Sequence, residues 1–525
     1  MYSTNGASFV HVADNPTLPA GQGGTGVMDI QVSGYQYNSF AQTPQISWTI
    51  AGTQGGALDS LNAAAYSRAG LASGSPVAVG RCAGRDGFCN ESLVVYQNGL
   101  IGTLGNNTAN NQTTVKLPAN KVPTGIAVTN NSEFALVTVW DTTALKGQVA
   151  VVSLAGLCNG CDPYNSSGYY DWWHEWGAPY PGLANVGDIA FMKILGYVDL
   201  PGITAPTEIS ATTGMDQWQT LLINGIFVGW DTPLTSQTNR QSFLNGGSNY
   251  GKYAKGGVAV VISKSEQKAA FIDLKPLFTY VNNTYFNVDQ ATFNARMASL
   301  GMADNQWPYT FAQDASQMPQ VVKTVSLSGR PTAVKASVYG SSRAWIATQD
   351  GTLHIYSLDG YAPGGSVGTP SASAFTEVGT VTGLGRNPTS IASSKAEPSN
   401  TSMDAMTSQI LVSSRGDRKV SWVRFTSNGN GGSIVRTLQD TRMADPIAVE
   451  DGNNFATANN LLSVADYTSK AVRNYRYGPV IFADGKACAS ATSCPVTPTG
   501  STAIEYGGAM SVLGKPFQIS TSNVP

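Results

Sequence analysis

Charged residues are scarce in this 525-residue chain: Asp, Glu, Lys and Arg make up 12% of it, against about 25% in an average soluble domain. The formal net charge is −2, and no stretch is rich in Lys and Arg. Because nucleic-acid binding depends on clustered cations, we expect no nucleic-acid partner. Ser, Thr, Asn and 57 Gly residues replace the missing charge, which favours a β-rich chain with many turns.

Long apolar runs are also missing. No segment reaches the about 18 apolar residues that a membrane helix needs, so we expect no membrane span. The first residues, Met1 to Gly6, lack the apolar core of a secretory signal peptide. They would fit the mature start of a secreted chain that carries an added Met.

Histidine and signatures of catalysis are rare. The three histidines, His11, His174 and His354, lie far apart, which is too few for a copper cluster or a three-histidine zinc site. His354 alternates within an apolar strand, so we expect it to be packed inside the protein. The chain has no Gly-x-Ser-x-Gly elbow and no Asp-x-Asp-x-Asp-Gly calcium loop. We therefore predict no metal centre of these kinds and no cofactor.

Six cysteines form three local pairs in Gly- and Asn-rich loops, and none is left over. This pattern predicts three disulfides and an oxidising compartment, periplasmic or extracellular; reduced thiols in a cytosolic protein are the alternative. The second pair has CxxC spacing, but Asp162 follows it, which disfavours c-type haem attachment and leaves a structural clip. The pairs are Cys82 with Cys89, Cys158 with Cys161, and Cys488 with Cys494.

One short pattern recurs along the chain: a proline, one or two variable residues, then a small apolar strand. Its clearest copy is Pro-Thr-Gly-Ile-Ala-Val from Pro123 to Val128. After the proline strand come a turn and three more strand-like segments, and four antiparallel strands in a repeated unit are typical of a β-propeller blade. The copies start at Pro76, Pro123, Pro206, Pro331, Pro388, Pro446 and Pro516.

Residues 122–154 and 330–358 resemble the YVTN-type β-propeller repeat most closely. The resemblance implies a fold and no particular reaction. We predict one all-β domain over residues 1–525, a seven-bladed β-propeller of four-stranded antiparallel blades. The Pro516 strand has no chain left to complete its blade, whereas strand-like segments between Ser8 and Ile50 precede the first unit. The N- and C-terminal segments are therefore expected to share one blade, which removes free sheet edges.

Four long insertions interrupt the repeats. If the strands of a blade are named A to D, the A–B and C–D connections emerge on the same face of the propeller. Each insertion is expected to be such a connection, so all should project from one face, and loops of this length often carry function. The insertions are residues 156–193, 213–256, 275–319 and 484–502.

Small residues dominate the proline strands, as crowding near the propeller axis would require. Four larger polar residues break this rule and are predicted to line the central channel. Carboxylates from two blades could hold a cation such as calcium or act as acid and base; alternatively, they are solvated or paired with the lysine. These residues are Glu208, Lys335, Glu450 and Gln518.

Aromatic residues gather in the insertions, and three tryptophans fall within five residues beside a cysteine pair. Exposed aromatic planes bind sugars by stacking or anchor protein interfaces, whereas buried ones would plug the loops onto the propeller. The candidates are Trp172, Trp173, His174, Trp176, Tyr180, Trp218, Trp230 and Trp307.

The sequence favours a secreted or periplasmic module for interaction or structure that meets a protein or glycan partner through its loop-rich face. An enzyme of the propeller hydrolase or lactonase kind, with a site at the channel mouth, is the first alternative. A subunit of a periplasmic redox complex, with the cofactor on another chain, is the second. We favour a non-enzymatic role, because no known set of catalytic residues can be matched to this sequence residue by residue.

The disulfides can be tested directly. We expect mass spectrometry of the alkylated, non-reduced protein purified from an oxidising compartment to find no free thiol. The cysteines should be linked as the three local pairs. Six alkylated cysteines would remove the argument for an oxidising compartment.

Overall fold

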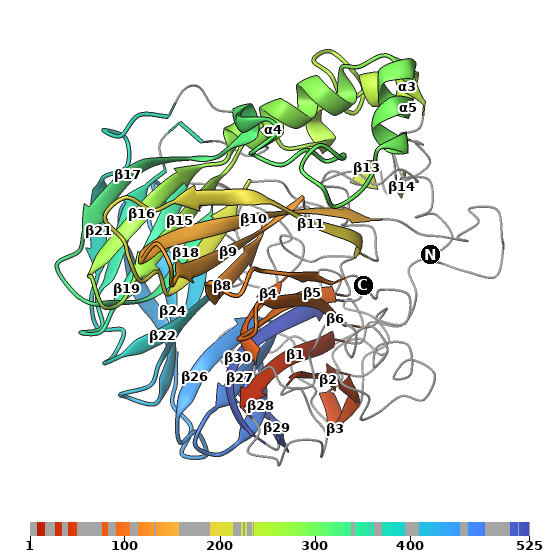
Figure 1. The fold of residues 1–525 in the computed structure, drawn as a ribbon. Coiled ribbons are helices and arrows are strands. Elements are labelled where there is room, and N and C mark those ends of the chain that lie inside the picture. Colours follow the sequence, from red (N-terminus) through yellow and green to blue (C-terminus); the bar gives the residue numbers. More distant parts are fainter. Residues whose placement is uncertain are drawn as a thin grey trace.

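The computed structural model confirms an all-β propeller (Figure 1). Its strands follow a repeated antiparallel order, and the described parts hold no helix long and apolar enough to cross a membrane. The structure describes residues 8–15, 27–33, 40–49, 76–81, 91–105, 114–130, 133–156, 189–213, 222–223, 226–227, 234, 236–337, 342–358, 360–361, 370–393, 409–451, 460–477, 504–512 and 514–523.

Six blades are each built from strands in chain order, and each is a four-stranded sheet. We number them from the N-terminal side. Blade 1 has β4 (Pro76–Arg81), β5 (Glu91–Tyr96), β6 (Leu100–Gly105) and β7 (Val115–Lys116), and blade 2 has β8 (Lys121–Val128), β9 (Phe134–Asp141), β10 (Lys146–Gly156) and β11 (Ile189–Asp199). Blade 3 has β12 (Glu208–Thr212), β15 (Val258–Ser263), β16 (Lys268–Asp273) and β17 (Gln320–Ser326), and blade 4 has β18 (Pro331–Ser337), β19 (Arg343–Thr348), β20 (Leu353–Ser357) and β21 (Glu377–Val381). Blade 5 has β22 (Pro388–Ser393), β23 (Gln409–Ser414), β24 (Lys419–Phe425) and β25 (Gly432–Leu438), and blade 6 has β26 (Pro446–Asp451), β27 (Asn460–Asp466), β28 (Ala471–Tyr477) and β29 (Ile504–Ser511).

The predicted count of seven blades is corrected to six blades of this continuous kind. The seventh proline strand, β30 (Lys515–Asn523), starts no continuous blade. It pairs instead with β1 (Ser8–Asn15), which continues to β2 (Val27–Ser33) and β3 (Phe40–Thr49). We call this composite of both chain ends the closing sheet. Contacts between β30 and both β26 and β4 place it between blades 6 and 1.

The proline-led strand of each sheet lies innermost and touches its counterpart in the next sheet around the whole ring. The third residue after each proline is a buried Val or Ile. It packs toward the preceding blade: Ile126 clusters with Ala78, and Ile391 clusters with Ala333. The seven third-position residues are Val79, Ile126, Ile209, Val334, Ile391, Val449 and Ile519.

The second residue after the proline is small in most blades because the next inner strand lies close. A Cβ placed on Gly125 would come within 3.3 Å of the Glu208 Cα and 3.0 Å of the Thr138 Oγ1. Such contacts are tighter than ordinary packing allows. The predicted crowding near the axis is therefore present.

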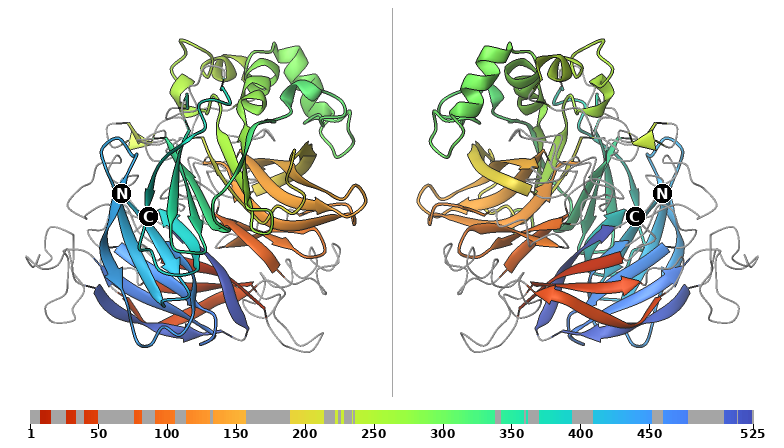
Figure 2. Two further views of the ribbon diagram at one scale, coloured as in Figure 1. Left: turned by 90° about the vertical axis from the view of Figure 1, so that its left-hand side faces the viewer. Right: turned by 90° about the vertical axis from the view of Figure 1, so that its right-hand side faces the viewer.

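The connections divide the propeller into two unlike faces. A–B and C–D connections share the loop-rich face. B–C and D–A connections, which are short in the six continuous blades, form the other, which we call the turn face. The insertions of blade 3 carry the helices, which lie together at one end of the molecule in both side views (Figure 2). Insertions 156–193 and 484–502 fall almost wholly outside the described residues.

The blade 3 insertions were expected to be loops, and the structure shows helices there. We call residues 236–256 and 274–319 the cap. Its first helix, α3, is short. Asp289 directly precedes α5, and its side chain caps that helix by accepting a hydrogen bond from Thr292 N. The helices are α3 (Gln237–Gln241), η4 (Tyr250–Lys252), α4 (Lys275–Val281), η5 (Asn282–Phe286), α5 (Gln290–Ala298) and η6 (Ala315–Gln317).

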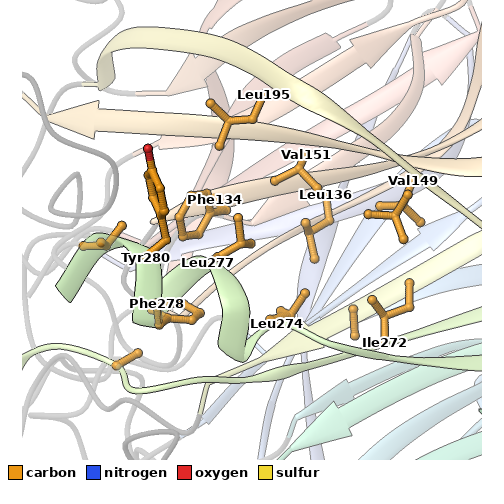
Figure 3. Packing of buried hydrophobic residues seen from close by; sticks show 14 of the residues in the cluster. Phe134, Leu136, Val149, Val151, Leu195, Ile272, Leu274, Leu277, Phe278 and Tyr280 are labelled. Carbon is orange, nitrogen blue, oxygen red and sulfur yellow. The ribbon is translucent and has the colours of Figure 1, made fainter. Parts of the chain in front are cut away.

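The cap shares one hydrophobic core with blades 2 and 3. Figure 3 shows side chains of the α4 region facing apolar side chains of blade 2 strands, among them Leu277 near Phe134 and Leu136. Phe278 meets the Phe134 ring edge-on, with centroids 5.6 Å apart. Burial of each such side chain stabilises the fold by about 1.5–3 kcal/mol. The cap is therefore held firmly on the propeller.

Candidate functional site

The structure brings two of the four predicted channel residues into the same role. Gln518 Oε1 accepts a hydrogen bond of 3.0 Å from Val79 N, and Glu208 Oε1 accepts one of 3.2 Å from Val334 N. Each acceptor is the second residue after its proline, and each donor is the third residue after the proline of the next inner strand. Inner strands have one edge without a partner strand, so their amides need other acceptors.

Sequence reasoning missed a third member of this set. Ser390 also occupies the second position, and its Oγ accepts a hydrogen bond of 3.2 Å from Val449 N. Its small size hid it among the alanines and glycines of the other proline strands. We call these three contacts the inter-blade hydrogen bonds. Its place as the second residue after a proline is the feature of the sequence that could have identified Ser390.

Glu208 differs from the other two acceptors because it carries a charge. Its Oε2 lies 3.8 Å from Lys264 Nζ, and 29% of its side chain remains exposed. Burial raises the pKa of Glu208, and the opposing effect of Lys264 is smaller. Glu208 therefore combines partial exposure with a carboxyl group that burial makes easier to protonate.

Lys335 and Glu450 share the fourth position after their prolines, in blades 4 and 6. Both are partly buried, and both take part in interactions. Within the described residues, no group of three or more His, Cys, Asp and Glu side chains could hold a metal ion. The predicted channel cation stays a prediction without a described ligand set.

Most aromatic candidates lie outside the described residues, and Trp307 is the exception. Trp307 is 1% exposed, so it belongs to the cap core and offers no contact surface. Its ring lies 5.4 Å from that of Tyr309, and the Arg296 guanidinium lies 5.2 Å from its centroid. The candidates outside the described residues are Trp172, Trp173, His174, Trp176, Tyr180, Trp218 and Trp230, with all six cysteines.

His354 is buried, as predicted. Its Nδ1 lies 3.3 Å from Glu377 Oε1 in the neighbouring strand. The contact joins strands β20 and β21 within blade 4, away from the cap. It gives this histidine a packing role.

Two buried cations fix the cap to its surroundings. Lys193 of β11 donates hydrogen bonds of 2.8 Å to the carbonyl oxygens of Ala303 and Gln306, and burial lowers its pKa to about 8. Arg240 of α3 donates to Leu234 O at 2.9 Å, and its guanidinium lies 3.7 Å from the Phe293 ring centroid on α5. Blade 2 and both cap insertions are thereby tied together.

A pocket of about 400 Å³ opens where the cap meets the C–D connection of blade 4. We call it the cap pocket. Polar groups come from the end of β16, from α4 and η5, and from the segment before β17, while prolines form part of the wall. The lining residues are Asp273, Lys275, Pro276, Thr279, Tyr280, Asn283, Thr284, Asp314, Ser316 and Pro370.

The carboxylates of the cap pocket are held in fixed positions. Asp273 Oδ1 accepts hydrogen bonds from the Tyr361 hydroxyl at 2.5 Å and from Lys275 N at 3.0 Å. Asp314 Oδ1 accepts from the amide and the hydroxyl of Ser316, at 3.0 and 2.6 Å. Tyr280 is buried beside Asp314, and burial raises the pKa of its hydroxyl well above the usual value. The pocket is therefore preformed.

Comparison with known proteins assigns this chain to no family. No family model and no curated protein matches the chain. A Bacteroides fragilis protein provisionally assigned as a 6-phosphogluconolactonase has a similar structure, with 9% identity, 99% of each chain covered and a TM-score of 0.43. Apo AztD from Citrobacter koseri is 9% identical over 99% of both chains, with a TM-score of 0.37.

A third similar structure is Chaetomium thermophilum Sqt1, solved with the N-terminus of ribosomal protein L10 bound. It is 11% identical over 77% of this chain and 71% of its own, with a TM-score of 0.36. Such distant likenesses concern the fold alone. Membership of the YVTN-type repeat family stays a prediction.

The charge of Glu208 can be separated from its hydrogen bond by the substitution Glu208→Gln. The amide keeps an acceptor for Val334 N but cannot titrate. Because the folded protein raises the pKa of Glu208, it binds the proton more readily than the unfolded chain, whose pKa is 4.5. Stability of the natural protein therefore falls as pH rises from 4.5 through the folded pKa. We therefore expect the free energy of unfolding of the variant, measured with urea, to increase relative to that of the natural protein as pH rises through this range.

Gln518→Ala is the matched control, because it removes an inter-blade hydrogen bond without removing a charge. Its loss of about 1 kcal/mol should be the same at every pH. A Glu208→Gln difference that does not vary with pH would show that the carboxyl is not perturbed.

Proposed function

We propose that the protein is a secreted or periplasmic binding module whose loop-rich face captures a protein or glycan partner. The cap pocket is the observation that carries this proposal. It is concave, it lies among fixed elements, and its volume of about 400 Å³ falls in the range of about 300–1,000 Å³ that is usual for ligand sites.

The chemistry of the cap pocket suits a polar ligand. Asp273 Oδ2 has no hydrogen-bond partner within the described residues, and neither has the side chain of Thr279 or Asn283. An acceptor, a hydroxyl and an amide thus face one space, beside the proline walls. Sugar hydroxyls and polar peptide groups can bond to such a set, and apolar walls cover the remaining surface.

Rigidity supports binding at this site. The pocket walls belong to the cap, whose core is continuous with blades 2 and 3, and Lys193 and Arg240 restrain its loops. A ligand that meets preformed groups loses less free energy to ordering than one that must organise a loop. The propeller thus acts as a support for the cap.

The channel offers less support for the enzyme alternative. Gln518 and Glu208 hold neighbouring blades together, which gives them a structural task. The raised pKa of Glu208 would suit an acid, but one of its oxygens already accepts the Val334 amide. The redox-subunit alternative rests on the cysteines and is supported by no described contact.

The binding role can be tested at the pocket rim with Asn283→Ala. Partners are first identified by native purification with mass spectrometry and by a glycan array. We expect the variant to lose about tenfold in affinity, which corresponds to about 1.4 kcal/mol, with unchanged thermal stability. Asn294→Ala is the control, since this exposed asparagine lies on α5 outside the pocket lining.

Unchanged binding by Asn283→Ala, together with binding by the natural protein, would place the contact elsewhere. A purified natural protein with no co-purifying chain and no glycan binding would contradict the proposed function as a whole.

A further inference from the structure

A second concave site lies on the turn face, opposite the cap, and is independent of the proposed function. It is a groove of about 690 Å³ that runs across turns of blades 3, 4 and 5. Its floor and walls come from B–C turns and from the turns before Pro331 and Pro388. The side chains that matter here are Gln267, Arg330, Gln349, Asp350, Arg386 and Asn387.

Backbone hydrogen bonds fix the turns of this groove to one another. Gln349 N donates to Arg330 O at 2.9 Å, and Asn387 N donates to Gln349 O at 2.8 Å. The first bond lies within blade 4, and the second joins blade 4 to blade 5. Leu327 N donates to Gln267 O at 2.8 Å on the blade 3 side. The groove is therefore a preformed feature of three adjacent blades.

The two arginines of the groove differ in how they are held. Arg386 is oriented by Asp417, with Nε 2.9 Å from Oδ1, and by the Gly416 carbonyl, 3.2 Å from Nη2. Its Nη1 has no partner within the described residues. The exposed Arg330 guanidinium has no described partner at all. Arginine in this state presents a planar set of donors that fits a carboxylate.

The one carboxylate in the lining is already occupied. Asp350 Oδ1 accepts from the Thr348 hydroxyl at 2.6 Å, and Oδ2 accepts from the Thr352 hydroxyl at 3.2 Å. The Thr348 hydroxyl contact is the first cause of its lowered pKa. The carboxylate therefore stays charged, and both of its oxygens already accept hydrogen bonds within its own turn. The amide groups of Gln267, Gln349 and Asn387 add N–H donors along the groove.

We propose that the turn-face groove binds an acidic polypeptide segment of a partner protein. Donors spaced over three consecutive blades suit an extended chain with several carboxylates better than one small anion. The protein would then bridge two ligands, one on each face. The contribution of Arg330 is the easiest to isolate, because its guanidinium has no hydrogen-bond or ion-pair partner among the described residues.

The test uses the full-length protein and a fluorescein-labelled peptide of alternating glutamate and serine, followed by fluorescence anisotropy. Binding should weaken as salt is added, because exposed charges are screened. Arg330→Gln should reduce affinity by about tenfold, since a charge-assisted hydrogen bond is lost. Its melting temperature should match that of the natural protein.

Lys146→Gln is the matched control. Lys146 begins β10 at the turn face of blade 2, is 43% exposed and pairs with Asp199, so its removal changes net charge equally outside the groove. This variant should keep affinity within about twofold, because distant exposed charges are screened. Equal losses of affinity in the two variants would indicate general charge attraction and would contradict binding in the groove.

Two further arms complete the test. A peptide in which glutamine replaces glutamate should not bind, and inorganic phosphate should compete only weakly. Phosphate that displaces the peptide at equal concentration would replace the proposal with a small-anion site. Absence of peptide binding at low salt would overturn it altogether.

Discussion

Contact between neighbouring inner strands is the constraint on which the rest of this structure depends. Every sheet presents a buried Val or Ile toward the preceding blade, and the facing position near the axis must leave room for it. Gly80 shows how tight this is, because a Cβ there would lie 3.2 Å from atoms of Ile126. The recurring proline pattern in the sequence reflects this packing requirement.

The same constraint determines which polar residues can lie near the axis. Gln518, Glu208 and Ser390 are retained at second positions because each accepts an amide of the adjacent inner strand. An unpaired buried amide costs about 1–3 kcal/mol, so these side chains stabilise the ring where they occur. These three residues therefore have a structural task at the blade boundaries.

The two faces differ in the connections they carry. Antiparallel order sends the long insertions to the loop-rich face, where helices pack on blades 2 and 3 and create the cap pocket. The turn face keeps short hairpins that are bonded from blade to blade, and the groove lies between them. One fold thus supports two concave sites of different chemistry.

The sequence predicted the inner strands well, because proline and the residues after it mark a local pattern. It gave the wrong count of continuous blades, because the final proline strand joins the N-terminal strands. The cap helices were missed, because the burial of Leu277 and Phe278 depends on blade 2 residues that are distant in the sequence. Trp307 was grouped with aromatic residues for which exposure and burial were both left open, and it is buried in that core.

Neither concave site could be read from the sequence. The cap pocket joins Asp273 to Pro370, which belong to different blades, and the groove joins Gln267 to Arg386. Each depends on which turns become neighbours after the ring closes. Gln518 and Glu208 were singled out as exceptions to small size, but the amides of Val79 and Val334 that they bind lie on the next blade, so the sequence carried no local signal for them.

The most direct test of inner-strand packing is the free energy of unfolding of Gly125→Val, compared with Gly251→Val. A side chain at Gly125 must enter the space beside Glu208 and Thr138, whereas a Cβ on Gly251 meets nothing within 4 Å. We expect a loss of about 1–3 kcal/mol at Gly125, as for overpacked cores, and a much smaller change at Gly251. Equal changes at the two sites would contradict the account.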